Sequence, residues 1–259
     1  MLLRLARHDR EEPDGIVQTI LEEEGFLRNK GNPTQRTILI DLTRSSEEIH
    51  KGLSKNWRRR LALAERNTIE TMEGDSLDLY DIYRKLDDEM MGLKHFVQYA
   101  NPDEYRKIQE ALPSRQKMGI MVCKYDNRPV AGVVWSGIGN TSLEILIATN
   151  AEGRELGTAY YLKWRELMWL KDHGFQWHDL AGINPVGNPG RFQFKTGVLG
   201  KDGKNGLDIQ PLGQYDAYVG VLDNTAVRLA DTLRLAYRSL RERMARKNRP
   251  TEQADAKGD

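Results

Sequence analysis

Residues 175–200, FQWHDLAGINPVGNPGRFQFKTGVLG, carry the main signals for the fold and for a site. The pattern predicts a strand over Phe175–Leu180, with Asp179 at its carboxyl end. A loop interrupted by glycine and proline follows over 181–190, and the aromatic and basic run Arg191–Lys195 comes directly after it. Because substrates of open α/β sheets lie at strand ends and in the loops that follow them, this stretch is a candidate substrate site.

The polar residues of this stretch that suit substrate contact are Asp179, Asn184, Arg191 and Lys195. A second interpretation is purely structural. In it, Phe192 and Phe194 belong to the core and Lys195 is a solvated surface charge. The residue types by themselves leave both interpretations open.

Two short motifs resemble a known family. D-L-A-G-I-N-P at 179–185, followed by F-K-T-G at 194–197, is similar to the closing signature of the Fem (FemAB-like) peptidyltransferases, the aminoacyl-tRNA-dependent branch of the GNAT-like acyltransferase superfamily. The similarity extends to T-I-L-I-D-L at 37–42 and to the helix W-R-R-R-L-A-L-A-E-R, and it covers roughly 37–218. It implies an α/β (α+β) mixed sheet of the GNAT-like acyltransferase fold, with Phe194 and Lys195 in the acyl-transfer site.

Composition sets outer limits on function. The chain has 259 residues, of which 39% are hydrophobic and 30% charged, as in ordinary globular proteins. A net charge of +1 gives no overall attraction to nucleic acid or acidic membranes, so any attraction must come from local patches. The single cysteine, Cys123, lies in a strand-like run and is expected in the core of a protein from a reducing compartment. With no apolar run near the ~20 residues that cross a bilayer, we predict a cytoplasmic protein.

The order of patterns predicts four segments. Residues 1–36 form an N-terminal extension with a short helix, 37–220 the GNAT-like domain, 221–249 a basic amphipathic helix, and 250–259 a disordered tail. Fem proteins with two domains carry another GNAT-like domain before the point that matches residue 37. Whether a partner chain supplies such a domain, and the oligomeric state, are left open by the sequence.

Within the domain, a capping signal at Thr43–Glu48 opens a helix predicted to run to about Arg66. Its outer face is basic. Either these arginines compensate the helix dipole, or Arg58 and Arg59 bind phosphate groups, as the similar helix of Fem proteins suggests. Further helices are predicted at 75–88 and 102–112. An antiparallel meander is predicted at 119–125, 130–136 and 142–148, and one or two final strands at 207–219 complete the sheet.

The segment Arg154–Ala159 has the R-x-x-G-x-A form of the GNAT pyrophosphate loop, in which Arg154 and Gly157 would contact phosphate at a helix N-terminus. The alternative is an ordinary helix start. In that case the buried stripe of the helix consists of Leu156, Ala159, Tyr160, Trp164, Leu167 and Met168.

The resemblance assigns roles to three residues. Lys195 would stabilise the negative charge on the carbonyl oxygen during acyl transfer. Phe194 would shape the pocket or stack on the terminal adenine of tRNA. Asp179 would orient the acceptor amine or accept its proton, unless it only caps the loop. Arg191, Asn184, Arg58 and Arg59 would contact substrate.

Three functions are compatible with these signals. The first is transfer of an aminoacyl group from aminoacyl-tRNA to an amine of a peptidoglycan precursor or peptide-like acceptor, with no cofactor and no metal. The second is acyl transfer from acyl-CoA to a small amine. The third is a non-catalytic binding protein. The 221–249 helix packs on the domain, docks nucleic acid, or makes peripheral contact with an anionic membrane.

Overall fold

The computed structural model describes most of the chain. The described residues are 2–10, 15–29, 36–93, 101–183, 188–209, 211–218, 225–227, 229–234, 236–237 and 240. Asn184, much of the predicted 221–249 helix and the whole predicted tail 250–259 therefore lie outside them.

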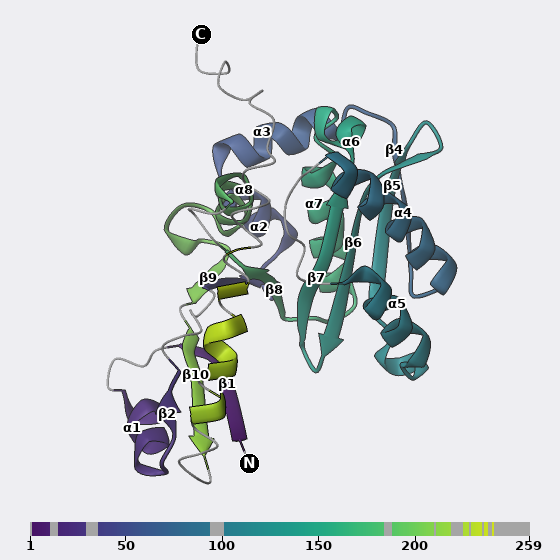
Figure 1. Ribbon diagram of the computed structural model, residues 1–259. Coiled ribbons are helices and arrows are strands. Elements are labelled where there is room, and N and C mark those ends of the chain that lie inside the picture. The colour runs from purple at the N-terminus through teal and green to yellow at the C-terminus, as the bar shows by residue number, and fades with distance from the viewer. Residues whose placement is uncertain are drawn as a thin grey trace.

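A mixed sheet forms the centre of the molecule (Figure 1). Its spatial order is β4 (Ile69–Gly74), β5 (Gly119–Tyr125), β6 (Arg128–Ile138), β7 (Thr141–Thr149), β8 (Trp177–Gly182), β3 (Thr37–Asp41) and β9 (Gly206–Ile209). Neighbouring strands are antiparallel except β7 and β8, which run parallel. The predicted α/β class and the β5–β6–β7 meander are confirmed.

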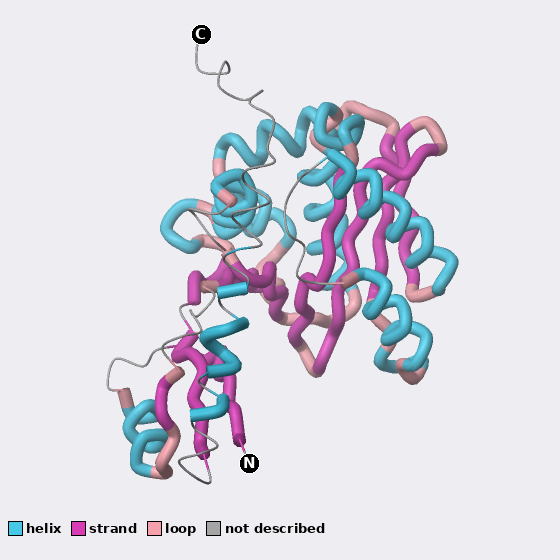
Figure 2. The backbone as a smooth tube through the Cα atoms, in the orientation of Figure 1, coloured by secondary structure: helices cyan, strands magenta, loops and turns pink. Residues whose placement is uncertain are grey.

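Helices cover both faces of this sheet (Figure 2). One face packs against α4 (Leu77–Leu93) and α5 (Pro102–Ala111), which η1 (Ser114–Gln116) follows. The other packs against α7 (Thr158–Asp172), on which α3 (Lys55–Ala64) lies. Strand alternation separates the two cores: Ile120 and Val122 lie with α4, whereas Met121 and Cys123 lie with α7. Burial raises the pKa of the Cys123 thiol to about 12, so the predicted core position of this cysteine is confirmed.

The single helix predicted up to Arg66 is wrong, because two helices are present. α2 (Ser46–Gly52) begins with a capping box between Ser45 and Glu48. α3 begins anew at Ser54, whose side chain accepts the Trp57 N–H. The Ser54 N–H donates at 2.9 Å to Gly197 O of α8 (Pro189–Leu199). This long-range contact, together with the extended backbone at Leu53, breaks the helix.

The buried face of α7 also differs from the predicted stripe. The fully buried residues are Thr158, Leu162, Lys163, Glu166, Leu167 and Leu170. Of the predicted stripe only Leu167 belongs to this set. Two ionisable side chains, Lys163 and Glu166, therefore lie in the core beside the sheet, where burial requires that they be paired. α7 is preceded by the short α6 (Ala151–Glu155).

A second, smaller sheet contains the N-terminal residues. Its order is β1 (Leu2–Arg10), β10 (Pro211–Tyr218) and β2 (Leu27–Arg28), and α1 (Ile16–Glu23) lies between β1 and β2 in sequence. The prediction that 207–219 completes the main sheet therefore holds for β9 but is wrong for β10. After η2 (Lys201–Gly203) and β9, the chain leaves the main sheet and β10 pairs with β1, from Leu2↔Tyr218 to Arg7↔Gly213.

The predicted C-terminal helix is helical at its described positions, 225–227, 229–234, 236–237 and 240. We call these residues the C-terminal helical segment. Among the described residues, no helix combines the length and the hydropathy that a bilayer span requires.

Candidate active site

The parallel pairing of β7 and β8 stops a third of the way along β7 and halfway along β8. The register runs from Thr141↔Trp177 to Leu143↔Asp179 and goes no further, although β7 continues to Thr149 and β8 to Gly182. Backbone groups that lose a strand partner inside a protein need another one. In this structure side chains supply it.

A bulge in β8 prepares the site. Thr37 of β3 pairs with Gly182 and Leu39 with Asp179, so a single residue of β3 faces two residues of β8. Ala181 accommodates the extra residue of β8 by adopting a left-handed φ of 58°. The Asp179 carboxylate holds this conformation, because its Oδ1 accepts the Ala181 N–H at 2.7 Å and the Thr37 hydroxyl. Asp179 thus lies within the strand rather than at its end, and its hydrogen bonds hold the bulge.

Three successive carbonyl groups surround the Lys195 ammonium as a result. Carbonyl groups of a regular strand alternate in direction. Here Lys195 Nζ donates to Leu180 O and lies 3.4 Å from both Ala181 O and Gly182 O. Lys195 is only 2% exposed, so its interpretation as a solvated surface charge is wrong.

Lys195 reaches this place because the Arg191–Lys195 run is helical. α8 starts at Pro189, and the Asn188 side chain caps it by accepting the Arg191 N–H at 3.0 Å. Burial lowers the pKa of Lys195 to about 8, even though Glu144 favours the charged form. The charged ammonium form therefore predominates at neutral pH, which lies only slightly below this pKa.

Glu144 of β7 joins the cations of two helices. Its Oε1 lies 3.4 Å from Lys195 Nζ and 3.1 Å from an Arg191 guanidinium nitrogen, and its Oε2 accepts from Lys163 Nζ at 2.6 Å. Burial by itself would raise the pKa of Glu144, but Lys163, Lys195 and Arg191 hold it well below its usual range. The carboxylate stays ionised and fixes both lysines.

Glu166, His178 and Ser142 continue the network into the core. Lys163 Nζ also donates to Glu166, and Glu166 Oε1 lies 3.3 Å from His178 Nε2. The other nitrogen, His178 Nδ1, is 2.8 Å from Ser142 Oγ. Burial raises the pKa of Glu166 to about 7, while burial and Lys163 keep the pKa of His178 well below its ordinary value. His178 is accordingly neutral.

The buried charge cluster consists of Glu144, Lys163, Glu166, His178 and Lys195, with Arg191 at its edge. Three cations, Lys163, Lys195 and Arg191, face two carboxylates, and burial raises the pKa of one of these, Glu166. The cluster therefore has an excess of positive charge. Glu144, Glu166 and His178 have metal-ligand atoms within 4.8 Å of one another, but the Lys163 ammonium already lies among those atoms. A metal ion would have to displace a cation, so the donor set does not fit one.

Arg191 is the accessible member of the cluster, with 43% of its side chain exposed. Phe194, in contrast, packs into the core. Its ring centroid is 5.1 Å from that of Tyr160 and 5.8 Å from that of Trp57. Phe194 therefore anchors α8 on α7 and α3, as its alternative core interpretation holds.

The other predicted substrate contacts lie away from the cluster. Arg58 donates to Lys51 O at 2.6 Å, and Arg59 to Asn56 Oδ1 at 3.1 Å, both on the helical face formed by α2 and α3. Arg154 is exposed and contacts Asn150 O at 3.3 Å. Asn184 lies outside the described residues.

Gly157 starts α7 with a left-handed φ of 70° and no side-chain cap. Both Gly157 and Thr158 are buried, and a Cβ at Gly157 would lie 3.6 Å from Arg60 O and 3.8 Å from the Ala64 Cβ of α3. Within the described part of the chain, the Thr158 hydroxyl has no hydrogen-bond partner. This helix end is thus uncapped but covered by α3.

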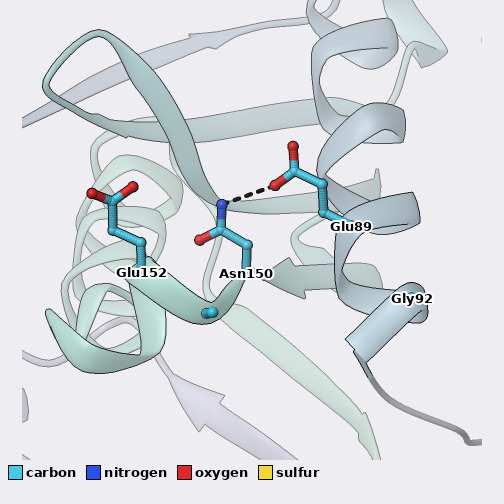
Figure 3. A pocket seen from close by; sticks show the side chains of 5 residues that line it. Glu89, Gly92, Asn150 and Glu152 are labelled. Carbon is cyan, nitrogen blue, oxygen red and sulfur yellow. Dashed lines mark hydrogen bonds between the residues drawn. The ribbon is translucent and has the colours of Figure 1, made fainter.

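Two surface hollows lie elsewhere. The larger, ≈ 480 Å³, is lined by Glu89, Gly92, Asn150, Ala151 and Glu152 (Figure 3). In it the Asn150 amide donates to Glu89 at 3.0 Å. A second hollow, ≈ 280 Å³, is lined by Ser46, Glu47, His50, Lys51 and Trp164. Neither hollow is lined by a residue of the buried charge cluster. The concave surfaces and the ionisable side chains with shifted pKa values therefore lie in different places. The cluster is the better candidate for the active site, because groups with shifted pKa values collect at active sites, whereas a wide apolar hollow shifts the pKa of no group.

Sequence reasoning identified Lys195, Arg191 and Asp179 but missed Glu144, Lys163, Glu166 and His178. One signal was present. Lys163 and Glu166 are three residues apart on the helix face that also carries Leu162, Leu167 and Leu170, and charge on an apolar face indicates buried pairing. Glu144 interrupts an apolar strand in the same way.

The sequence matches the acetyltransferase (GNAT) domain family over residues 51–196. No curated protein matches it in sequence. Among solved structures, the crystal structure of FemX superposes with a TM-score of 0.71 at 10% identity, covering 89% of this chain and 74% of that one.

Two further structures are similar. The C-terminal domain (DUF2156) of a putative lysylphosphatidylglycerol synthetase from Agrobacterium fabrum has a TM-score of 0.55 at 13% identity, over 89% of this chain and 71% of that one. L-PGS from Bacillus licheniformis has a TM-score of 0.52 at 16% identity, over 90% and 72%. At these identities the likeness concerns the fold.

Proposed function

Because this chain belongs to the acetyltransferase (GNAT) domain family and is an acyltransferase, we propose that it moves an aminoacyl group from aminoacyl-tRNA to an amine of a peptidoglycan precursor or peptide-like acceptor. One observation carries the proposal: the Lys195 ammonium is buried at the interrupted β7–β8 edge, between the β8 carbonyl groups and Glu144. The fold likeness to FemX over 89% of the chain supports it.

In this reaction the acceptor amine attacks the carbonyl carbon of the aminoacyl ester. A C–N bond forms, the ester C–O bond to the ribose breaks, and the amine loses a proton. Negative charge develops on the carbonyl oxygen and needs a fixed positive partner. A lysine ammonium has three hydrogens. Lys195 Nζ donates to Leu180 O, Ala181 O and Gly182 O and lies 3.4 Å from Glu144 Oε1. The contacts with Ala181 O and Gly182 O are both long, at 3.4 Å, so one of them is the contact that the reacting oxygen would replace.

Fixing the ammonium beforehand is what makes it effective. A free lysine would have to reorganise with its water shell during the reaction, whereas this one is already desolvated and oriented. Glu144 and the β8 bulge therefore act as positioning groups. They hold Lys195 and do not themselves contact the reacting atoms.

Arg191 has a different role. Its guanidinium is tied to Glu144 on one side and half exposed on the other, so it can bind a phosphate or carboxylate of the substrate bidentately. Both the tRNA end and a peptide-like precursor carry such groups. The excess positive charge of the cluster favours the same ligand chemistry.

Lys195→Met tests the proposal. Loss of a group that stabilises the oxyanion typically costs ~10²–10³ in rate. We expect a loss of this order in the transfer of labelled amino acids from a mixture of charged tRNAs to a soluble peptidoglycan precursor, with an unchanged circular dichroism spectrum.

Lys171→Met is the matched control, because Lys171 is a half-buried lysine whose Nζ likewise donates to a backbone oxygen, Leu42 O, at 3.0 Å. It should keep full activity. If Lys195→Met retained turnover within threefold of the parent, Lys195 would have no part in the mechanism.

Acyl-CoA is the second candidate donor. The uncapped start of α7 and the Thr158 hydroxyl without a partner among the described residues favour an anion there, whereas the cover by α3 opposes it. Thermal stabilisation distinguishes the donors, because a ligand that binds the folded protein raises Tm. Stabilisation by CoA thioesters and not by charged tRNA would replace the first proposal with the second.

A further inference from the structure

Large exposed apolar side chains collect at the smaller sheet and the C-terminal helical segment. In α1, Ile16 is 53% exposed and Ile20 52%. In the segment, Leu229, Leu233 and Tyr237 are each 62% exposed and Leu240 56%. Spacings of four, four and three residues place these four side chains on one face of a helix. We call them the apolar stripe.

The opposite side of the segment is the one that contacts the protein. Asp231 is only 17% exposed, and the Asn29 amide at the end of β2 donates to it at 3.2 Å. The same amide donates to Asp216 of β10 at 2.8 Å. Figure 1 draws the segment in yellow next to this sheet. A surface helix normally buries its apolar face and exposes its polar one. Here the arrangement is reversed, so the apolar stripe faces away from the small sheet.

The charge of this part of the sequence indicates which kind of surface the apolar stripe binds. Residues 225–249 contain eight Lys and Arg against two Asp and Glu, whereas the whole chain has a net charge of only +1. An exposed apolar stripe on a helix, in a strongly basic stretch of sequence, is typical of segments that lie in the surface of an anionic bilayer. The apolar side chains enter the acyl boundary while the basic ones meet the headgroups.

We propose that the C-terminal helical segment docks the protein on an anionic lipid surface through Leu229, Leu233, Tyr237 and Leu240. Nucleic acid would engage the basic residues but leave the stripe in water. A second copy of the chain would cover the stripe but would bring two strongly basic stretches of sequence together. An anionic bilayer satisfies both features at once. The inference does not depend on which acyl donor the protein uses.

Co-sedimentation of the full chain with vesicles tests the proposal. We expect binding to vesicles of phosphatidylcholine with about one third phosphatidylglycerol, at least tenfold weaker binding to pure phosphatidylcholine, and weakening by salt because anionic headgroups contribute. The double variant Leu229→Ser with Leu233→Ser keeps the charge and removes apolar area. It should lower the vesicle affinity at least tenfold.

Ile138→Ser is the matched control, since Ile138 is 85% exposed at the end of β6 and far from the segment in sequence. It should bind vesicles like the parent. All three substitutions lie on the surface, so circular dichroism should show an intact fold. Absence of vesicle binding by the parent, equal binding by the double variant, or a dimer in solution that the double variant dissociates would each overturn the proposal.

Discussion

At the scale of single residues, the site depends on how β8 is bent at Ala181. A left-handed φ is unfavourable for alanine, by roughly 1–2 kcal/mol. It persists because the Asp179 carboxylate accepts two hydrogen bonds that only this conformation allows. The consequence is the convergence of carbonyl groups on Lys195. Asp179 thus affects the reaction indirectly, by fixing the backbone that binds Lys195.

The Asp179 carboxylate can be tested against its predicted role as a proton acceptor. An asparagine keeps an oxygen that accepts both hydrogen bonds but cannot take up a proton. If Asp179 positions the bulge, Asp179→Ala should lose about as much activity as Lys195→Met, whereas Asp179→Asn should stay within about tenfold of the parent. The measurement is kcat of aminoacyl transfer for both variants. Equal inactivity of the two would instead favour proton transfer.

The pKa of Lys195, about 8, predicts the pH dependence of the rate. Only the ammonium form stabilises the oxyanion, so kcat should fall as pH rises through about 8. In Lys195→Arg the guanidinium stays charged, so residual activity should show no such fall up to pH 10. If kcat of the parent rose through pH 8 and kcat of Lys195→Arg did not, Lys195 would instead act as a base.

At the scale of elements, the site is held by the contact of α8 with α3. Gly197 of α8 faces Trp57 of α3 and Ser54, which caps α3, and the Trp57 ring packs at a tilt of 41° against that of Phe194. The same contact places the helix break at Ser54, because the Ser54 N–H needs Gly197 O. The position of Lys195 relative to β8 therefore depends on how closely two helices approach.

Gly197→Ala should disturb this approach. The new Cβ would lie 2.8 Å from Trp57 Cδ1 and 3.1 Å from Ser54 Oγ, closer than carbon atoms normally pack. Overpacking typically costs ~1–3 kcal/mol, more than the ~1 kcal/mol that alanine gains in a helix. We expect a net loss of unfolding free energy in urea titration, with reduced kcat.

Gly190→Ala provides the control in the same helix, because nothing lies within 4 Å of its new Cβ. It should be neutral or slightly stabilising. Equal stability of Gly197→Ala and Gly190→Ala would show that the α3–α8 contact tolerates expansion and does not fix α8.

At the scale of the whole molecule, charge is divided between a buried site and a distal surface. The cluster places its cations at the break between β7 and β8, where they replace backbone pairing. The C-terminal helical segment contacts the smaller sheet, which joins the N-terminal strand β1 to β10, and lies in a strongly basic stretch of sequence. A protein held on a lipid surface by this segment would keep its acyl-transfer site on the other sheet. The vesicle and transfer assays therefore report on separate parts of the structure.

The local sequence determined much of this architecture. Alternation of apolar residues in β5, β6 and β7, the capping box at Ser45 and the proline at the start of α8 act within a few residues, so the strands and most helices follow from them. The F-K-T-G motif likewise singled out Lys195.

Contacts between distant residues decided the rest. The bulge needs Thr37 beside Asp179, the cluster needs Glu144 beside Lys163 and Lys195, and β10 needs β1 as its partner. A sequence read alone cannot rank such pairings, because the cost of burying a charge depends on which partner the fold brings within hydrogen-bond distance. That is why the lysine was found from sequence, but the carboxylate that holds it was found only in the folded protein.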